Sequence, residues 1–119
     1  MIKNRIINTA QLSERIDGDM GLLRELTEIF TADSEKLIGN IKSSMAAGDA
    51  VKTAKAAHTL KGAVSIFSAA YAYEKALNLE KIGKSGDLTG SEAACLELEE
   101  AVAQVITELK ELTSRDSLT

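Results

Sequence analysis

The chain has 119 residues, a formal net charge of −4, a pI near 5.0, one cysteine and no proline or tryptophan. This length fits a single domain, and the acidic balance excludes the broad basic surface that would attract nucleic acid or an anionic membrane. No apolar run approaches the roughly 20 residues of a membrane span. Residues 1–4 do not lead into a secretory signal, so we expect a cytoplasmic protein.

The residue mix favours helices over strands. Ala, Leu, Glu and Lys are abundant, while aromatic residues make up only 3% of the chain. A short first helix is predicted after a cap at Asn8 or Thr9, with Leu12 and Ile16 on one side. The pair Asp17-Gly18 ends it.

The second predicted helix begins at Asp19, whose side chain suits a helix N-cap, and ends near Gly48. Its apolar face consists of Leu23, Leu26, Phe30, Leu37 and Ile41. Asp49 suits the cap of a third helix that runs to about Phe67. A tight turn therefore joins two antiparallel helices.

The third predicted helix carries the single histidine of the chain, His58. Residues two apart lie about 200° apart around a helix, so a helix that buries Leu60 exposes His58. Lys61 lies one turn from the imidazole. The outer face around His58 also carries Lys55, Gly62 and Ser65. Glycine inside a helix costs roughly 1 kcal/mol relative to alanine, which indicates close approach by another molecule at Gly62.

A fourth helix is predicted from about Ala69 to Ile82, with Ser68 as its N-cap and a break over Gly83–Gly86. Thr89-x-x-Glu92 has the form of a capping box and predicts the start of the last helix. The apolar stripe of that helix consists of Cys95, Leu98, Val102, Val105, Leu109 and Leu112. Such a seam is typical of a left-handed helical bundle, in which Cys95 is a small buried hydrophobe.

These elements together predict an all-α fold, an antiparallel four-helix bundle with a short additional N-terminal helix. We expect residues 1–119 to form one domain with an ordered core over about 9–113. A lone cysteine excludes both a disulfide framework and a cysteine-rich zinc site.

The segment His58-Thr59-Leu60-Lys61-Gly62 resembles the His-x-Leu-Lys-Gly signature of the histidine phosphotransfer (HPt) domains of two-component phosphorelays. The resemblance continues in Gly18-Asp19-x-x-Leu22-Leu23, Gly48-Asp49, Phe67-x-Ala69 and Leu79-Glu80, and it extends over roughly Thr9 to Leu112. One departure is Ser68, where the family commonly has glycine.

The resemblance implies that His58 accepts a phosphoryl group from the aspartyl-phosphate of one receiver domain and passes it to the aspartate of another. A neutral imidazole suits this role because it is a nucleophile near neutral pH. Lys61 would offset phosphoryl charge, and Gly62 would let the partner approach. The residues expected to contact the partner are Lys55, Gly62, Ser65 and Ser68.

The expected partners are response-regulator receiver domains and a hybrid histidine kinase. We expect the domain to be a monomer that contacts neither nucleic acid nor membrane and holds no metal or other cofactor. Any Mg²⁺ would belong to the carboxylates of the receiver. The sequence has no glycine-rich loop that could cradle ATP phosphates, so a phosphoryl carrier without intrinsic kinase activity is predicted.

Two other functions fit the same helices. One is the phosphoryl-accepting domain of a chemotaxis-type kinase, whose histidine is charged by an ATP-binding domain. The other is a non-catalytic helical adaptor in which His58 has no role. A di-iron bundle enzyme fits poorly because such sites need Glu-x-x-His pairs, whereas Lys55 lies three residues before the only histidine.

Overall fold

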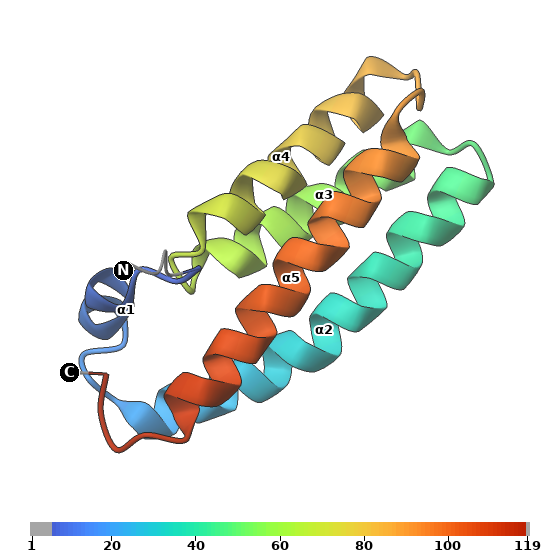
Figure 1. Ribbon diagram of the computed structural model, residues 1–119. Coiled ribbons are helices and arrows are strands. Elements are labelled where there is room, and N and C mark those ends of the chain that lie inside the picture. Colours follow the sequence, from blue (N-terminus) through green and yellow to red (C-terminus); the bar gives the residue numbers. More distant parts are fainter. Residues whose placement is uncertain (1–5, 119) are drawn as a thin grey trace.

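The computed structural model describes residues 6–118, and within that range the chain is helical with no strand. The helices are α1 (Thr9–Arg15), α2 (Met20–Ala46), α3 (Ala50–Ser65), α4 (Ala70–Ser85) and α5 (Ser91–Thr113). The four long helices form an antiparallel bundle, and α1 covers one end of it (Figure 1). This architecture confirms the predicted fold class. The expectation for residues 1–4 lies outside the described range.

The first three helices begin where their capping residues predict. The side chains of Asn8, Asp19 and Asp49 each accept a hydrogen bond from the backbone N–H three residues later, at 3.0 to 3.1 Å. Between α2 and α3, Gly48 has φ of +69°, a left-handed conformation that costs glycine little. The tight turn between α2 and α3 is therefore determined by Gly48 and Asp49 within the turn itself.

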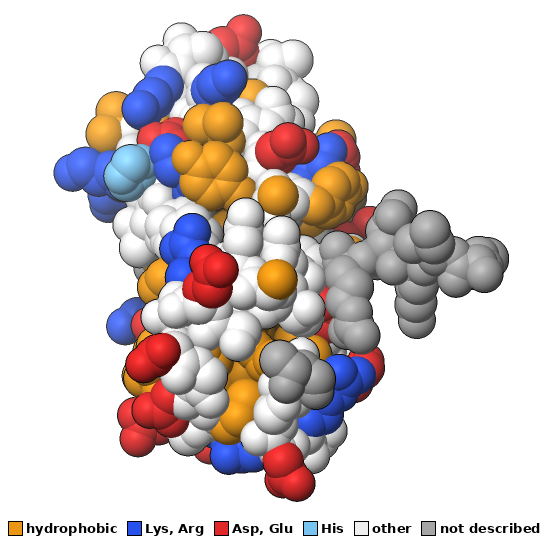
Figure 2. All heavy atoms as spheres, turned by 90° about the vertical axis from the view of Figure 1, so that its left-hand side faces the viewer, with side chains coloured by type: hydrophobic (Ala, Val, Ile, Leu, Met, Phe, Trp, Pro, Cys, Tyr) orange, Lys and Arg blue, Asp and Glu red, His pale blue; other side chains and the backbone are white. Residues whose placement is uncertain are grey.

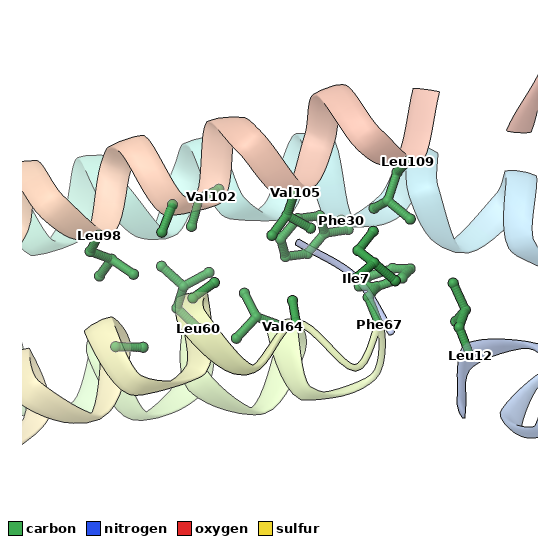
Figure 3. Packing of buried hydrophobic residues seen from close by; sticks show 14 of the residues in the cluster. Ile7, Leu12, Phe30, Leu60, Val64, Phe67, Leu98, Val102, Val105 and Leu109 are labelled. Carbon is green, nitrogen blue, oxygen red and sulfur yellow. The ribbon is translucent and has the colours of Figure 1, made fainter. Parts of the chain in front are cut away.

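The core runs along the bundle axis and closes at the end under α1. The α5 seam from Cys95 to Leu112 is buried as predicted, and it faces Leu60 and Val64 of α3 (Figure 3). Phe67 packs against Phe30, with ring centroids 5.1 Å apart. Because Leu60 is completely buried, the helix that carries it has a fixed rotation.

Two predicted helix ends are wrong. The capping box at Thr89 does not form: α5 begins at Ser91, after Gly90 with φ of +83°. The Thr89 hydroxyl instead donates to the Asp87 carboxylate at 2.7 Å, a local side-chain bond that competes with capping. Gly83 does not break α4, which continues to Ser85 and ends at the left-handed Gly86.

Ser68 is not the N-cap of α4, contrary to prediction. The cap position belongs to Ala69, which makes no side-chain cap bond. Ser68 has φ of +55°, and its buried Oγ has no hydrogen-bond partner. Its carbonyl oxygen accepts from the N–H of Asn8 at 3.1 Å and thereby ties the N-terminal segment to the turn. The turn needs a left-handed residue at this position, and that need overrides capping.

Over residues 6–118, none of the helices combines the length and the apolar character needed to cross a membrane.

Replacing Ser68 by glycine should raise the free energy of unfolding by about 1 kcal/mol. Glycine adopts positive φ without steric cost, and the substitution also removes a buried hydroxyl that lacks a partner. Urea unfolding followed by circular dichroism measures the change. Ser68→Ala is the control, since it removes the hydroxyl and keeps the backbone strain. If Ser68→Gly is no more stable than Ser68→Ala, the strain argument is wrong.

Candidate functional site

The site begins with the rotation of α3. Its stripe from Thr53 to Val64 is buried in the bundle, whereas the side chain of His58 is 65% exposed. The predicted opposition between Leu60 and His58 is therefore observed. The Cβ that a side chain would add at Gly62 meets no atom within 4 Å, so the surface beside the imidazole is open. No helix contact explains this glycine.

A carboxylate from the neighbouring helix orients the imidazole. His58 Nδ1 lies 2.8 Å from Oε2 of Glu80 in α4. An ionised carboxylate only accepts hydrogen bonds, so the proton of the neutral ring is assigned to Nδ1. Nε2 then keeps its lone pair, and no group within residues 6–118 hydrogen-bonds it. The nucleophilic nitrogen is thus the one on the open side of the ring.

Glu80 is itself buried, with only 1% of its surface exposed. Lys61 Nζ lies 2.7 Å from Oε1, and Lys84 Nζ lies 3.2 Å from Oε2. Oε1 has no hydrogen bond of good geometry, so the charge of Lys61 is its main compensation. Lys61, and then His58 and Lys84, lower the pKa of Glu80 from 4.5 to about 2 against the opposing effect of burial. The carboxylate is therefore ionised at neutral pH.

The structure changes the expected position of Lys61. Its side chain is 16% exposed and is directed at Glu80 instead of at solvent. Its ammonium also lies 5.9 Å from the centroid of the Tyr73 ring. The close contact with the Glu80 carboxylate raises the pKa of Lys61 above its ordinary value. The main contact of the Lys61 ammonium is thus the Glu80 carboxylate.

Sequence reasoning gave no functional role to Glu80. The available signal was its place on the face of α4 that also carries Ala76 and Leu79, since a carboxylate on a buried face needs a cationic or hydrogen-bonding partner. Lys84 was also missed, although it lies one turn after Glu80 on the same helix. Its side chain is 68% exposed and lines the same depression as His58.

The other predicted contact residues divide into two groups. Lys55 is exposed and lines a shallow depression together with His58 and Lys84. Ser65 lies one turn after Gly62, and its hydroxyl donates to the Gly62 carbonyl at 2.7 Å. Ser68 lies apart from this group, in the turn beside Asn8. The structure therefore brings Lys55 to the imidazole, keeps Ser65 near Gly62 and separates Ser68 from both.

Close packing between α3 and α4 brings the Glu80 carboxylate within hydrogen-bond distance of His58. A Cβ added at Gly83 would lie 2.7 Å from the backbone nitrogen of Ala54 and 2.9 Å from the carbonyl oxygen of Ala50. These neighbours are backbone atoms and cannot rotate away. Gly83 lies three residues after Glu80 in α4, so this contact fixes the helix spacing close to the His58–Glu80 pair.

A helical bundle with one exposed, carboxylate-oriented histidine defines a class of proteins suited to carrying a group on that histidine. The Hpt domain model matches residues 25–108, and the chain belongs to the Hpt domain family. Its role is accordingly histidine phosphotransfer in a phosphorelay, and proteins of this family are phosphoryl carriers rather than kinases.

One solved structure supports the fold. It is the crystal structure of histidine-containing phosphotransfer protein B from Pseudomonas aeruginosa PAO1, similar with a TM-score of 0.84 at 24% sequence identity. The match covers 95% of this chain and 98% of that one. No curated protein matches the sequence. Within the described part of the chain, no group of three or more His, Cys, Asp and Glu residues could hold a metal ion.

The buried charges predict a specific loss of stability in acid. Because the folded-state pKa of Glu80 is about 2 and its ordinary value is 4.5, its contribution is present above pH 4.5 and is lost as pH falls toward 2. Glu80→Gln should therefore lose less unfolding free energy than the wild type over this interval. Urea unfolding at a series of pH values measures it. Glu100→Gln, which removes an exposed carboxylate, should keep the wild-type pH dependence, and identical profiles for all three proteins would contradict the prediction.

Gly83→Ala should weaken the His58–Glu80 hydrogen bond without removing any charged group. The added Cβ meets backbone, so α4 must shift away from α3. The ¹⁵N chemical shifts of His58 would then report a lower fraction of the Nδ1–H form. Gly39→Ala is the matched control, because a Cβ on that helical glycine meets nothing within 4 Å. An unchanged His58 spectrum in folded Gly83→Ala would rule out the spacing argument.

Proposed function

We propose that the domain is a phosphorelay intermediate that accepts a phosphoryl group on Nε2 of His58 from a receiver aspartyl-phosphate and passes it to a second receiver. One observation carries the proposal: Glu80 takes Nδ1 at 2.8 Å on an imidazole that is 65% exposed, which leaves Nε2 as the open nucleophile. The open surface at Gly62 adds room for a protein partner.

The transfer step balances without a base. The Nε2 lone pair forms a bond to phosphorus, and the bond between phosphorus and the aspartyl oxygen breaks, so the receiver recovers a carboxylate. The ring keeps its Nδ1 proton and becomes a cation, which the Glu80 carboxylate stabilises at hydrogen-bond distance. The reverse step on a second receiver returns the electron pair to Nε2. Glu80 therefore stabilises the phosphorylated ring both when the group is accepted and when it is passed on.

The lysines have separate roles in this proposal. Lys61 holds Glu80 in its ionised, buried position, so its effect on transfer passes through the carboxylate. Lys84 and Lys55 have exposed side chains in the depression beside His58 and would offset charge on the phosphoryl oxygens. Direct support of the phosphoryl group, which the sequence suggested for Lys61, is therefore proposed mainly for Lys84 and Lys55.

The domain is proposed to carry the group and not to generate it. Its partners would be response-regulator receivers and the receiver of a hybrid histidine kinase, and they would supply the Mg²⁺ that neutralises phosphate charge during transfer. We propose that the domain carries the phosphoryl group as a cytoplasmic monomer. Both transfers would use the single exposed histidine in turn.

The decisive experiment incubates the domain with a receiver phosphorylated on its aspartate and follows acid-labile label on the domain. The wild type should gain label and His58→Gln should gain none. Gly62→Gln should fold normally and accept the group more slowly, because its side chain fills the open approach. Normal rates in Gly62→Gln would contradict the approach argument.

The same assay separates the rival functions. Label from the ATP-binding domain of a histidine kinase, without label from any receiver, would favour the chemotaxis-type alternative. An adaptor predicts that His58→Gln retains every activity of the wild type. A small phosphodonor such as phosphoramidate serves as the positive control, because it tests the nucleophile without requiring protein docking.

A further inference from the structure

The ammonium group of Lys61 has a second neighbour on α4 besides Glu80. Its Nζ lies 2.7 Å from the Glu80 carboxylate and 5.9 Å from the centroid of the Tyr73 ring. Tyr73 and Glu80 are about two turns apart on α4, and Lys61 reaches them from α3. Figure 2 shows basic and hydrophobic side chains gathered next to the histidine. One aromatic ring and one carboxylate of α4 therefore share a single cation of α3.

The aromatic face of Tyr73, and not its hydroxyl, makes this contact. Within residues 6–118 the hydroxyl forms no hydrogen bond. An aromatic face attracts a cation that lies within about 6 Å of its centroid, and the attraction grows as water is removed. The Lys61 side chain is largely removed from water. The ring therefore favours the inward conformation of Lys61 over one that extends into solvent.

The position of Lys61 matters for His58 because both side chains contact the same carboxylate. Lys61 lies at Oε1 of Glu80, and His58 Nδ1 lies at Oε2. If the carboxylate loses part of this compensating charge, it attracts a second proton to the imidazole more strongly, and a doubly protonated ring has no lone pair on Nε2. The other charged groups that face the ring are Lys55 of α3 and Lys84 of α4. In the described part of the chain, only Lys61 lies over the Tyr73 ring.

We propose that Tyr73 is a positioning residue of the transfer site, whose ring holds the Lys61 ammonium against Glu80 and thereby favours the neutral, nucleophilic form of His58. This inference rests on the proposed phosphorelay function. It adds a residue that acts on the nucleophile through two other side chains without touching the imidazole or the phosphoryl group.

A similar arrangement on the same helix provides a matched control. Lys75 Nζ lies 5.1 Å from the centroid of the Tyr71 ring and 3.3 Å from the Glu97 carboxylate. Tyr71 and Tyr73 are exposed to a similar extent, at 48% and 37%. The chain has a single histidine, so the group around Tyr71 contains no imidazole. Removing the Tyr71 ring thus deletes the same kind of contact without affecting the nucleophile.

The test measures the rate of labelling by phosphoramidate at about pH 6 and at about pH 8, on either side of the usual range of histidine titration. In Tyr73→Leu the ratio of the first rate to the second should fall about 2-fold relative to the wild type, because a larger fraction of the imidazole takes a second proton. Tyr73→Phe retains the ring and should keep the wild-type ratio, as should Tyr71→Leu. An unchanged ratio in folded Tyr73→Leu, or an equal fall in Tyr73→Phe or Tyr71→Leu, would overturn the proposal.

A double-mutant cycle distinguishes positioning from simple packing. In a Lys61→Met background, Tyr73→Leu should cause no further change in the ratio, because the cation that the ring holds is absent. An equal effect of Tyr73→Leu with and without Lys61 would show that the ring acts by packing and would reject the proposal.

A measurement on the wild type requires neither a stable variant nor phosphotransfer. The ring current of Tyr73 should shift the NMR signals of the Lys61 methylene protons next to Nζ upfield, and ordinary shifts would overturn the proposal. Labelling of His58 by a phosphorylated receiver reports the proposed function separately. Normal labelling together with ordinary Lys61 shifts would reject only the role of Tyr73. Labelling by phosphoramidate but by no receiver would reject the relay function, and the ratio of rates would still decide the role of Tyr73.

Discussion

The ion pair and hydrogen bond of Glu80 are the interactions on which the rest of this site depends. A buried carboxylate is costly unless it is compensated, and here Lys61, Lys84 and His58 all contribute to its compensation. The same carboxylate decides which imidazole nitrogen keeps its lone pair. One buried group thus links the stability of the α3–α4 pair to the reactivity of an exposed ring.

The geometry of the bundle makes this link possible. Gly83 allows the backbones of α3 and α4 to approach closely, and the close approach lets a glutamate side chain on one helix reach a histidine on the other. The α5 seam and Leu60 fix the rotation of α3, which keeps the imidazole outside. Packing at the centre of the protein therefore determines chemistry at its surface.

The surface around His58 has two properties that suit a carrier used by more than one partner. It is open, because Gly62 presents no side chain and faces no neighbouring atom. It also carries exposed lysines, because Lys55 and Lys84 line the depression beside the imidazole. Neither property depends on a deep pocket, so the imidazole is accessible from a shallow surface.

The sequence by itself determined the helices, the caps at Asn8, Asp19 and Asp49, the α5 seam and the exposure of His58. These features follow from local capping and from the 3.6-residue period, which act within one helix. Only the tertiary structure decided that Glu80 binds Nδ1, that Lys61 turns inward, that Gly83 stays inside α4 and that Ser68 takes a left-handed turn. Each of these depends on the distance between segments remote in sequence, and periodicity within a single helix contains no such distance.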